Sequence, residues 1–455
     1  MRIHFIAIGG SAMHNLAIAL QAKGDVISGS DDEIFEPARS NLASHNLLPE
    51  KEGWDANKIT PELDAIVLGM HSKSDNPELV EAQRQGIKIY SYPEYLYQVS
   101  KHKKRIVIGG SHGKTTITAM ILHVLRHLGI ETDYMVGAKL EGMDVMVRLS
   151  QTAQYMVIEG DEYLTSPLDL RPKFHLYNPT IALISGIAWD HINVFPTFDN
   201  YIEQFRIFID KITDDGTLIY CNDDKVLCDV VSQARNDIKK QAYKALPYRI
   251  ENGVTILQYK NKDYPLQVFG QHNVTNISGA MAVCEQIGVC GEDFLQSILS
   301  FKGAAKRLEV VGQSNEVTIY KDFAHSPSKL DATIAAVREQ FSKRRLVVCL
   351  ELHTYSSLTS EFLKQYKGTM DKADIAAVFY NPHAVALKRL PNIEPDFIKT
   401  AFGRADMEVY TGKTKLEEFI IRQDFHNANL LMCSSGNYDS MDLTQLAQTI
   451  IDKTK

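Results

Sequence analysis

Residues 105–116 read RIVIGGSHGKTT, and this stretch decides the fold of the chain. Its apolar start predicts a β-strand, and the glycine-rich part that follows predicts a tight turn. The apolar residues that come next have the spacing of one face of a helix: Ile117, Met120, Ile121, Val124, Leu125 and Leu128. A strand, a glycine loop, a Lys-Thr pair and a helix in this order are the setting of a phosphate-binding loop.

The chemistry of this loop favours a nucleotide. Glycines let backbone N–H groups approach phosphate oxygens, and a helix N-terminus adds positive potential. Lys114 is placed for the β- and γ-phosphates of ATP, and the Thr115 hydroxyl for Mg²⁺. The general pattern has another glycine five residues before Gly113, where this chain has Ile108, so a fortuitous Gly-Lys-Thr is the alternative. The flanking strand and helix favour ATP.

Two further strand ends carry groups that suit a magnesium–ATP site. Residues 159–163 (EGDEY) follow an apolar run, and Asp190 and His191 come shortly after another run at residues 181–185. Ligands of open α/β sheets gather at the carboxyl ends of strands, so both clusters are expected near the phosphates. Carboxylates and imidazoles are also common metal ligands. Alone, each cluster is more typical of a solvated turn or a helix cap.

Short β-branched runs alternate with helical patterns, as in parallel α/β proteins. Expected strands are residues 3–8, 25–28, 65–68, 88–90, 106–108, 317–320, 346–350, 375–379, 408–410 and 430–433. Expected helices include residues 13–22, 76–85 and 278–287. The pattern predicts three α/β domains in series, at residues 1–102, 103–303 and 304–455. The basic run at residues 100–105 is interpreted as a solvated connection, with a nucleic-acid patch as the alternative.

The composition excludes several classes of protein. Lys and Arg number 49 against 56 Asp and Glu, and this net charge of −7 argues against a general nucleic-acid binder. The 44% hydrophobic and 23% charged residues are typical of a soluble globular protein. The cysteines show no C-x-x-C pair and no zinc spacing, which predicts buried free thiols in a reducing compartment. We expect a cytoplasmic protein, because no signal-peptide pattern or membrane-spanning apolar segment is visible.

A second glycine loop opens the first domain. Residues 9–13 (GGSAM) follow an expected strand and begin a helix, and Asp31 lies 22 residues after Gly9. The arrangement is similar to a dinucleotide-binding fingerprint, although the G-x-G-x-x-G pattern is absent. The residues alone leave two alternatives for this loop. It is either the cofactor loop of a nicotinamide-dependent oxidoreductase or a glycine turn that serves only packing.

Six segments together resemble the Mur ligases in order and spacing: residues 106–116, 159–163, 190–191, 270–276 (GQHNVTN), 306–309 (KRLE) and 322–327 (DFAHSP). The Mur ligases are the ATP-dependent amide-forming enzymes of peptidoglycan synthesis, and the resemblance covers essentially the whole chain. It implies an N-terminal Rossmann-like UDP-binding domain, a central P-loop ATPase domain and a C-terminal Rossmann-like domain that closes over the site. It also implies ATP and Mg²⁺ as cofactors, with release of ADP and phosphate.

The resemblance carries site roles onto residues of this chain. It implies that ATP is bound by Gly110, Ser111, His112, Gly113, Lys114, Thr115, Thr116, His272, Asn273, Asn276 and Arg307. It implies that Mg²⁺ is held, directly or through water, by Thr115, Glu159 and His191. It implies a UDP-sugar site at Gly9, Gly10, Ser11, Ala12, Met13, Asp31, His71, Ser72 and Asn76. The implied catalytic set is Lys114, Glu159, His191, Asp322 and His325, and the implied acceptor contacts are His353 and Thr354.

Within the family, the chain is similar to the murein peptide ligases, which join the recycled tripeptide L-Ala-γ-D-Glu-meso-diaminopimelate to UDP-N-acetylmuramate. The shared features are the start at Met1 without an extension, the Tyr that ends residues 159–163, and residues 171–174. The alternative branch adds L-alanine to the same carboxylate in de novo synthesis. Its members have Arg where this chain has Thr354, and Arg suits the carboxylate of a small amino acid.

The resemblance implies an acyl-phosphate mechanism, in which a carboxylate attacks the γ-phosphate of ATP and an amine then displaces phosphate. Water must be excluded from this intermediate, so domain closure is expected. Three positions depart from the family pattern: Gly186 replaces an Asn, residues 203–206 lack the carbamylated lysine of relatives, and Ser326 replaces a His. These departures leave open a regulatory ATPase that binds a UDP-sugar without ligation. The sequence predicts no nucleic-acid or membrane partner and does not determine the oligomeric state.

Overall fold

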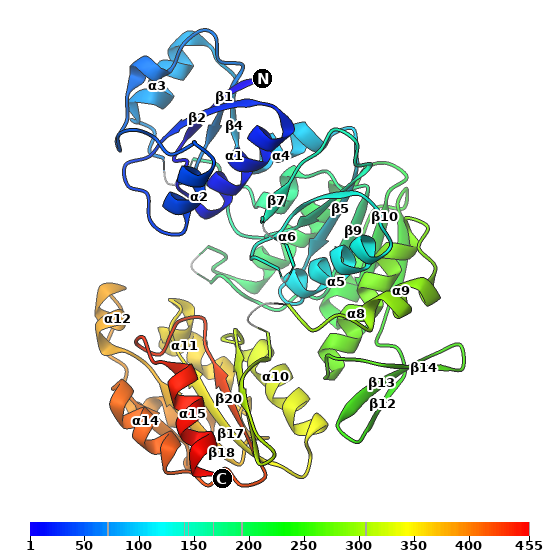
Figure 1. The fold of residues 1–455 in the computed structure, drawn as a ribbon, viewed down its shortest axis with the longest axis vertical. Coiled ribbons are helices and arrows are strands. Elements are labelled where there is room, and N and C mark those ends of the chain that lie inside the picture. Colours follow the sequence, from blue (N-terminus) through cyan, green and yellow to red (C-terminus); the bar gives the residue numbers. More distant parts are fainter. Residues whose placement is uncertain are drawn as a thin grey trace. The chain divides into compact units, whose positions relative to one another are not determined.

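Four β-sheets, connected by helices, make up the part of the chain that the structure describes (Figure 1). The computed structural model describes residues 1–70, 72–140, 142–143, 145–166, 168–192, 194–304 and 307–454. The chain divides into two units, which are described separately. Unit 1 comprises Met1–Trp189, Pro196–Lys244 and Ile277–Ile298, and unit 2 comprises Asp190–Phe195, Ala245–Asn276 and Leu299–Lys455.

The first sheet of unit 1 has four parallel strands in the order β2-β1-β3-β4. Its strands are β1 (Arg2–Ile6), β2 (Val26–Ser30), β3 (Ala65–Leu68) and β4 (Ile89–Ser91). Its helices are α1 (Ser11–Lys23), α2 (Ala38–Ser44), η1 (Ala56–Lys58), α3 (Pro77–Gln85) and α4 (Tyr92–Ser100). Apolar side chains such as Ile6, Ile66 and Leu79 form a buried cluster here. The strands and helices predicted in this region are confirmed to within two residues.

The second sheet of unit 1 has seven strands in the order β11-β10-β9-β5-β8-β6-β7, all parallel except β7. Its strands are β5 (Lys104–Gly109), β6 (Thr132–Met135), β7 (Val147–Arg148), β8 (Tyr155–Glu159), β9 (Ile181–Ile184), β10 (Thr217–Cys221) and β11 (Lys239–Tyr243). The helices are α5 (Lys114–His127), η2 (Lys173–Leu176), α6 (Phe198–Asp210), α7 (Lys225–Ser232), α8 (Gln271–Glu285) and α9 (Gly291–Ile298). Because β5 lies between β8 and β9, the ends of both neighbours flank the glycine loop.

Unit 2 is built on a six-stranded sheet in the order β15-β16-β20-β17-β18-β19, parallel except for β15. Its strands are β15 (Glu309–Gln313), β16 (Val317–Asp322), β17 (Arg345–Glu351), β18 (Ile375–Phe379), β19 (Glu408–Tyr410) and β20 (Ala428–Cys433). Its helices are α10 (Pro327–Gln340), η3 (Ser356–Leu358), α11 (Ser360–Leu363), η4 (Lys364–Tyr366), α12 (Pro382–Leu387), α13 (Pro395–Phe402), α14 (Lys413–Ile421) and α15 (Leu443–Lys453). Along β17, Val348 and Leu350 enter one core, whereas Val347 and Cys349 enter another. Burial on both faces explains the unbroken apolar run that predicted this strand.

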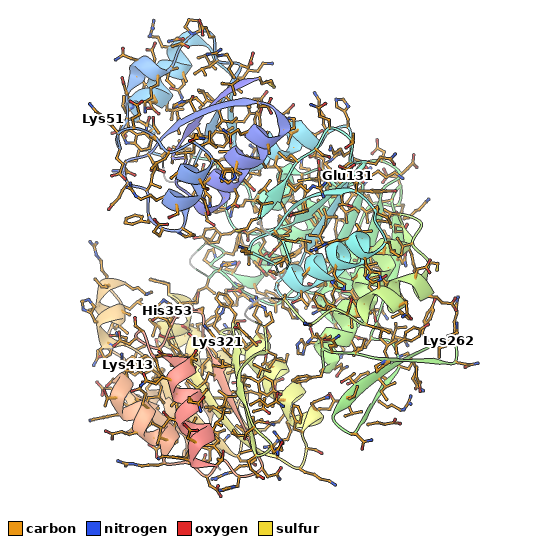
Figure 2. All side chains as sticks on the ribbon, in the orientation of Figure 1. Lys51, Glu131, Lys262, Lys321, His353 and Lys413 are labelled. Carbon is orange, nitrogen blue, oxygen red and sulfur yellow. The ribbon has the colours of Figure 1, made fainter. Side chains whose placement is uncertain are left out.

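Unit 2 also holds a three-stranded antiparallel sheet that the α/β pattern did not predict: β12 (Tyr248–Glu251), β13 (Val254–Tyr259) and β14 (Lys262–Pro265). Its two hairpin turns, Asn252-Gly253 and Lys260-Asn261, place all four residues at positive φ. Two-residue hairpins of type I′ require this conformation, and Asn-Gly is a strong signal for them. Figure 2 shows Lys262 at the outer end of the sheet.

Two other expectations need correction. α8 starts at Gln271 rather than at residue 278, so the polar motif at residues 270–276 forms the start of this helix. All six cysteines are free, but Cys290 is exposed and Cys228 is half-buried, so burial holds for the other four. Among the described residues, no helix combines the length and apolar character needed to cross a membrane.

The three-stranded sheet is joined to α10 by a hydrogen bond from the Thr255 hydroxyl to Gln340 Oε1 at 2.9 Å, and both side chains are buried. Thr255→Val keeps the side-chain shape but removes this donor. We expect the free energy of unfolding to fall by about 1–3 kcal/mol, because a buried polar atom loses its partner. Urea denaturation measures the change. Thr449→Val on α15 is the control, expected within about 0.5 kcal/mol of the parent, and an equal loss in both variants would contradict the interpretation.

Candidate active site

The phosphate-binding loop joins β5 to α5 in a conformation that favours glycine. Gly110 and Gly113 have φ of 123° and 80°, in the left-handed region. A Cβ on Gly110 would lie 2.1 Å from Ser185 Oγ, just after β9, and the Ser185 hydroxyl donates to the His112 carbonyl. Ile108, where the general pattern has glycine, is fully buried within β5. The loop therefore begins after this position, and the missing glycine does not disrupt it.

Lys114, the first residue of α5, is held by two acceptors in a buried setting. Its Nζ donates to the Gly110 carbonyl at 2.7 Å and pairs with Glu162 Oε2 at 2.5 Å. Burial disfavours the charge of Lys114, but the carboxylates of Glu162 and Asp161 raise its pKa above the ordinary value. The loop thus carries a stable cation where a phosphate would bind. Glu162 lies in the predicted acidic segment, but no role was predicted for it.

Thr115 and Glu159 place oxygen atoms that suit a hard cation such as Mg²⁺ beside Lys114. The Thr115 hydroxyl donates to Glu159 Oε1 at 2.6 Å, and the Gly137 N–H donates to Oε2 at 2.8 Å. Mg²⁺ keeps several waters and takes one or two protein ligands beside phosphate oxygens, so this pair fits it. The described residues contain no cluster of three or more candidate metal ligands. His191, the third predicted ligand, lies in unit 2.

A chain of hydrogen bonds ties Glu162 to the loop serine through Tyr201 of α6. The Tyr201 hydroxyl donates to Glu162 Oε1 at 3.1 Å and lies 2.9 Å from Ser111 Oγ. Ser111 Oγ accepts the Ala188 N–H at 2.8 Å, and the Ser111 N–H donates to the Gly186 carbonyl at 3.0 Å. Both polar groups of Ser111 therefore shape the loop. Tyr201 had no signal in the sequence, because it lies on an ordinary amphipathic helix.

The space beside Gly186, where the family resemblance implies an Asn, is occupied by side chains of other segments. A Cβ on Gly186 would lie 2.8 Å from Asp224 Oδ2 and 2.8 Å from His112 Cε1, and its φ of 152° is unfavourable for other residues. Asp224 accepts the Ile187 N–H at 2.7 Å and also caps α7. The carboxylate of Asp224 thus occupies the space that a longer side chain at Gly186 would need.

In unit 2, Asp190 lies in a group of charged and polar side chains. Lys329 Nζ is 3.4 Å from Asp190 Oδ2. Burial opposes the ionisation of Asp190, but the positive charges of Lys329 and His191 bring its pKa to about 2. His325 donates from Nδ1 to the Phe323 carbonyl at 2.8 Å, and burial lowers the pKa of His325 to about 4. His325 is therefore neutral near pH 7, with Nε2 as an acceptor. The sequence did not single out Lys329.

The carboxylate of Asp322, which was predicted as a catalytic residue, stabilises a turn inside unit 2. It accepts the N–H groups of Leu308 and Ala324, each at 2.7 Å, and burial raises its pKa. The two bonds hold the segments that carry Arg307 and His325. The Arg307 guanidinium lies 5.0 Å from the centre of the Phe323 ring, within cation–π range. Contact of Arg307 with ATP stays a prediction.

The predicted base-binding motif forms the first turns of α8. Asn273 Nδ2 donates to the Phe269 carbonyl at 2.9 Å, and Asn276 is buried. His272 lies beside Gly270, where an added Cβ would be 3.1 Å from its ring. These residues therefore form a helix N-terminus, and their nucleotide role stays a prediction.

The predicted UDP-sugar loop is organised by Asp31. Its Oδ2 accepts the Gly9 N–H at 2.6 Å, and a Cβ on Gly9 would lie 2.9 Å from that oxygen. Burial raises the pKa of Asp31 to about 6. Gly10 precedes α1, whose first residues Ser11, Ala12 and Met13 belong to the predicted set.

Asn76 and Ser72, two other predicted UDP-sugar residues, differ in whether the side-chain oxygen is already hydrogen-bonded within the fold. Asn76 caps α3 by accepting the N–H groups of Glu78 and Leu79, so its side-chain oxygen is used within the fold. Ser72 is buried, and its hydroxyl has no hydrogen-bond partner among the described residues. His71 lies outside the described residues. His14 was not predicted, although it is buried and donates from Nδ1 to the Gly10 carbonyl at 2.9 Å.

The predicted acceptor residues follow β17 (Figure 2). His353 is half-exposed, and its Nδ1 lies 3.6 Å from Glu351 Oε1. Thr354 Oγ1 accepts the Ser357 N–H at 3.1 Å, so this side chain starts the turn into η3. Glu351 was not predicted, yet it is buried and accepts the Tyr438 N–H at 2.8 Å.

Tyr201→Phe removes the hydroxyl that joins Glu162 to Ser111. We expect the free energy of unfolding to fall by about 1–3 kcal/mol, because two buried groups lose a partner. Tyr177→Phe is the matched control, since Tyr177 is equally buried but its hydroxyl has no hydrogen-bond partner among the described residues. Urea denaturation should show little or no loss for Tyr177→Phe. Equal losses in the two variants would mean that the hydrogen bonds of Tyr201 contribute nothing.

Known protein families and proteins match this chain along most of its length. Residues 2–104 match the domain described as Mur ligase family, catalytic domain; residues 108–284 match the Mur ligase middle domain; and residues 306–434 match the Mur ligase glutamate ligase domain. The UDP-N-acetylmuramate–L-alanine ligase of Caldicellulosiruptor bescii is 31% identical over 383 residues, which cover 81% of this chain and 81% of that protein.

Two solved structures have the same fold over the full length of this chain. The UDP-N-acetylmuramate–alanine ligase of Thermotoga maritima aligns with a TM-score of 0.68 and 19% identity, covering 100% of this chain and 99% of that one. A murein peptide ligase of Psychrobacter arcticus aligns with a TM-score of 0.61 and 21% identity, covering 100% and 98%. Together with the domain matches, these findings confirm the three-domain α/β architecture, and the chain belongs to the Mur ligase family of ATP-dependent amide-forming ligases.

Proposed function

We propose that this chain uses ATP to join the amino group of an acceptor to the carboxylate of UDP-N-acetylmuramate. The buried Lys114–Glu162 pair carries the proposal. It keeps a cation in the phosphate-binding loop, next to the Thr115 and Glu159 oxygens that suit Mg²⁺. A carboxylate becomes reactive toward an amine only after one of its oxygens is turned into a leaving group, and phosphoryl transfer from ATP does this.

The proposed chemistry has two steps. The substrate carboxylate attacks the γ-phosphorus of ATP, which forms an acyl phosphate and releases ADP. The acceptor amine then attacks the acyl carbon and loses a proton, and phosphate leaves. Lys114 contributes by exchanging Glu162 for a phosphate oxygen, so its charge stays beside the transferred group. Thr115 and Glu159 would hold Mg²⁺, which supplies further neutralisation of phosphate charge.

Two features of the first sheet support a sugar nucleotide as the carboxylate donor. The N-terminus of α1 at Gly10 offers backbone N–H groups and positive potential to a pyrophosphate. The buried Ser72 hydroxyl follows β3 and has no partner among the described residues, so a ligand that accepts or donates a hydrogen bond there would relieve its desolvation.

L-Alanine is the first candidate acceptor, because relatives at about 30% identity over four-fifths of the chain are named UDP-N-acetylmuramate–L-alanine ligases. The tripeptide L-Ala-γ-D-Glu-meso-diaminopimelate is the second candidate. Thr354 favours it, since the position where the L-alanine ligases have Arg carries no charge here. The Thr354 hydroxyl is also engaged in its own turn. A cation for a small amino acid's carboxylate is therefore missing at this position.

One assay separates these candidates. Purified chain is supplied with ATP, Mg²⁺ and UDP-N-acetylmuramate, and with either L-alanine or the tripeptide, and the amide product is identified by mass. Product with L-alanine supports the first candidate, and product only with the tripeptide supports the second. ATP hydrolysis without product from either amine would favour a regulatory ATPase instead.

Lys114→Ala tests the role of the loop cation. We expect the rate of product formation to fall at least about 100-fold, because a charge that stabilises the transferred phosphoryl group is lost. Lys225→Ala is the matched control, since Lys225 is also the first residue of a helix that follows a strand of this sheet, but lies outside the glycine loop. Full activity in Lys114→Ala would remove the basis of the mechanism.

A further inference from the structure

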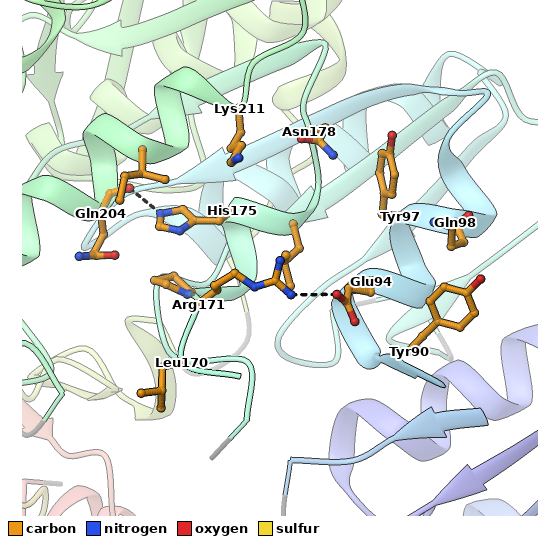
Figure 3. A pocket seen from close by; sticks show the side chains of 13 residues that line it. Tyr90, Glu94, Tyr97, Gln98, Leu170, Arg171, His175, Asn178, Gln204 and Lys211 are labelled. Atoms are coloured by element: carbon orange, nitrogen blue, oxygen red, sulfur yellow. Dashed lines mark hydrogen bonds and ion pairs between the residues drawn. The ribbon is translucent and has the colours of Figure 1, made fainter. Parts of the chain in front are cut away.

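A pocket in unit 1 contains none of the residues assigned to ATP or to the UDP-sugar. Its volume is about 670 Å³, a size typical of small-molecule sites (Figure 3). One wall comes from β4 and α4, through Tyr90, Tyr97 and Gln98, and the other comes from the η2 region and α6. Pockets between segments that belong to different domain matches, here residues 2–104 and 108–284, are common places for ligands.

The lining of this pocket combines apolar surface with aromatic rings. Leu176 and Ile207 contribute aliphatic surface, and Tyr90 and Tyr97 contribute ring surface. Leu170 also lines the pocket and is 67% exposed, an unusual degree of exposure for a large aliphatic side chain. A ligand with an apolar or aromatic body would remove these side chains from water.

Lys211 supplies a positive charge to this pocket that no ion pair of the described residues compensates. Arg171 and Lys211 are its cations, and Glu94 is the one acid that lines it. The charge of Arg171 is already compensated, because it pairs with Glu94 Oε1 at 2.8 Å (Figure 3) and with Asp169 Oδ2 at 2.7 Å. Lys211 has no ion-pair partner anywhere in the described ranges. The negative charge of an anionic ligand would compensate the positive charge of Lys211.

His175 lies in the wall of the pocket near both cations. Its Nε2 donates to the Gln204 carbonyl at 2.7 Å, which fixes the ring in the pocket wall. The pKa of His175 is lowered to about 4, first by burial and then by the positive charges of Lys211 and Arg171. His175 is therefore neutral near pH 7, and Lys211 remains the group that would attract an anionic ligand.

We propose that this pocket binds a small organic anion whose apolar body packs between Tyr97 and Ile207 and whose negative group pairs with Lys211. The inference is independent of which acceptor the enzyme uses. It defines a binding site outside the ATP and UDP-sugar residues, formed by α4, η2 and α6.

Anilinonaphthalene sulfonate, an aromatic anion that fluoresces in apolar surroundings, is the probe for this site. It is titrated into the full chain in the presence of saturating Mg·ADP, so that the nucleotide site is filled. We expect one saturable binding event. Lys211→Glu should weaken it at least about fivefold, because an attraction becomes a repulsion. Gln98→Trp should abolish it by filling the pocket.

Lys239→Glu on β11 is the control, since it changes the net charge equally at an exposed position away from the pocket, and it should leave the dissociation constant unchanged. Circular dichroism confirms that each variant is folded. Unchanged binding in both Lys211→Glu and Gln98→Trp overturns the proposal. An equal weakening in Lys239→Glu also overturns it, because the effect would then be a general effect of net charge.

Discussion

The buried ion pair between Lys114 and Glu162 is the interaction on which the rest of the site depends. An ammonium group at the start of α5 is desolvated and sits beside the positive end of a helix, and both conditions disfavour its charge. The carboxylate of Glu162, whose Oε2 lies 2.5 Å from Lys114 Nζ, compensates for both effects. Removing one partner of such a pair leaves an uncompensated buried charge, at a typical cost of about 3–5 kcal/mol. A phosphate can take the place of Glu162 without this cost, because it brings its own negative charge.

Sheet topology explains how these groups meet. β5 is central, with β8 and β9 on its two sides, and Ile108 pairs with Glu159 on one and Leu183 on the other. The segments that follow β8 and β9 therefore reach the glycine loop from opposite sides. Glu159 and Glu162 come from the first, and Ser185 and Gly186 come from the second. α6 then adds Tyr201, which closes the hydrogen-bond chain back to the loop.

The sequence predicted the features that depend on local pattern. The strands of the large sheets were visible because both faces are buried, as in β17, and the loop was visible because its glycines and Lys114 are contiguous. The small sheet β12–β14 was not predicted, although its Asn252-Gly253 turn is a local hairpin signal. Its attachment through the Thr255–Gln340 bond, between residues 85 positions apart, leaves no such signal. Tyr201 was missed because its partner Ser111 lies 90 positions away. Long-range polar partners leave no periodic signal in a single sequence.

Several residues predicted to touch ligands also hold the backbone around the predicted sites. Asp31 accepts the Gly9 N–H, Asn76 caps α3, and Asp322 accepts two N–H groups in the turn before α10. A short side chain with a carbonyl or carboxylate oxygen is the usual means of fixing such turns. Motif spacing therefore identifies where a ligand loop must be held still. Contact with the ligand itself stays a prediction for these residues and for Lys114, and the Ser72 hydroxyl has no hydrogen-bond partner among the described residues.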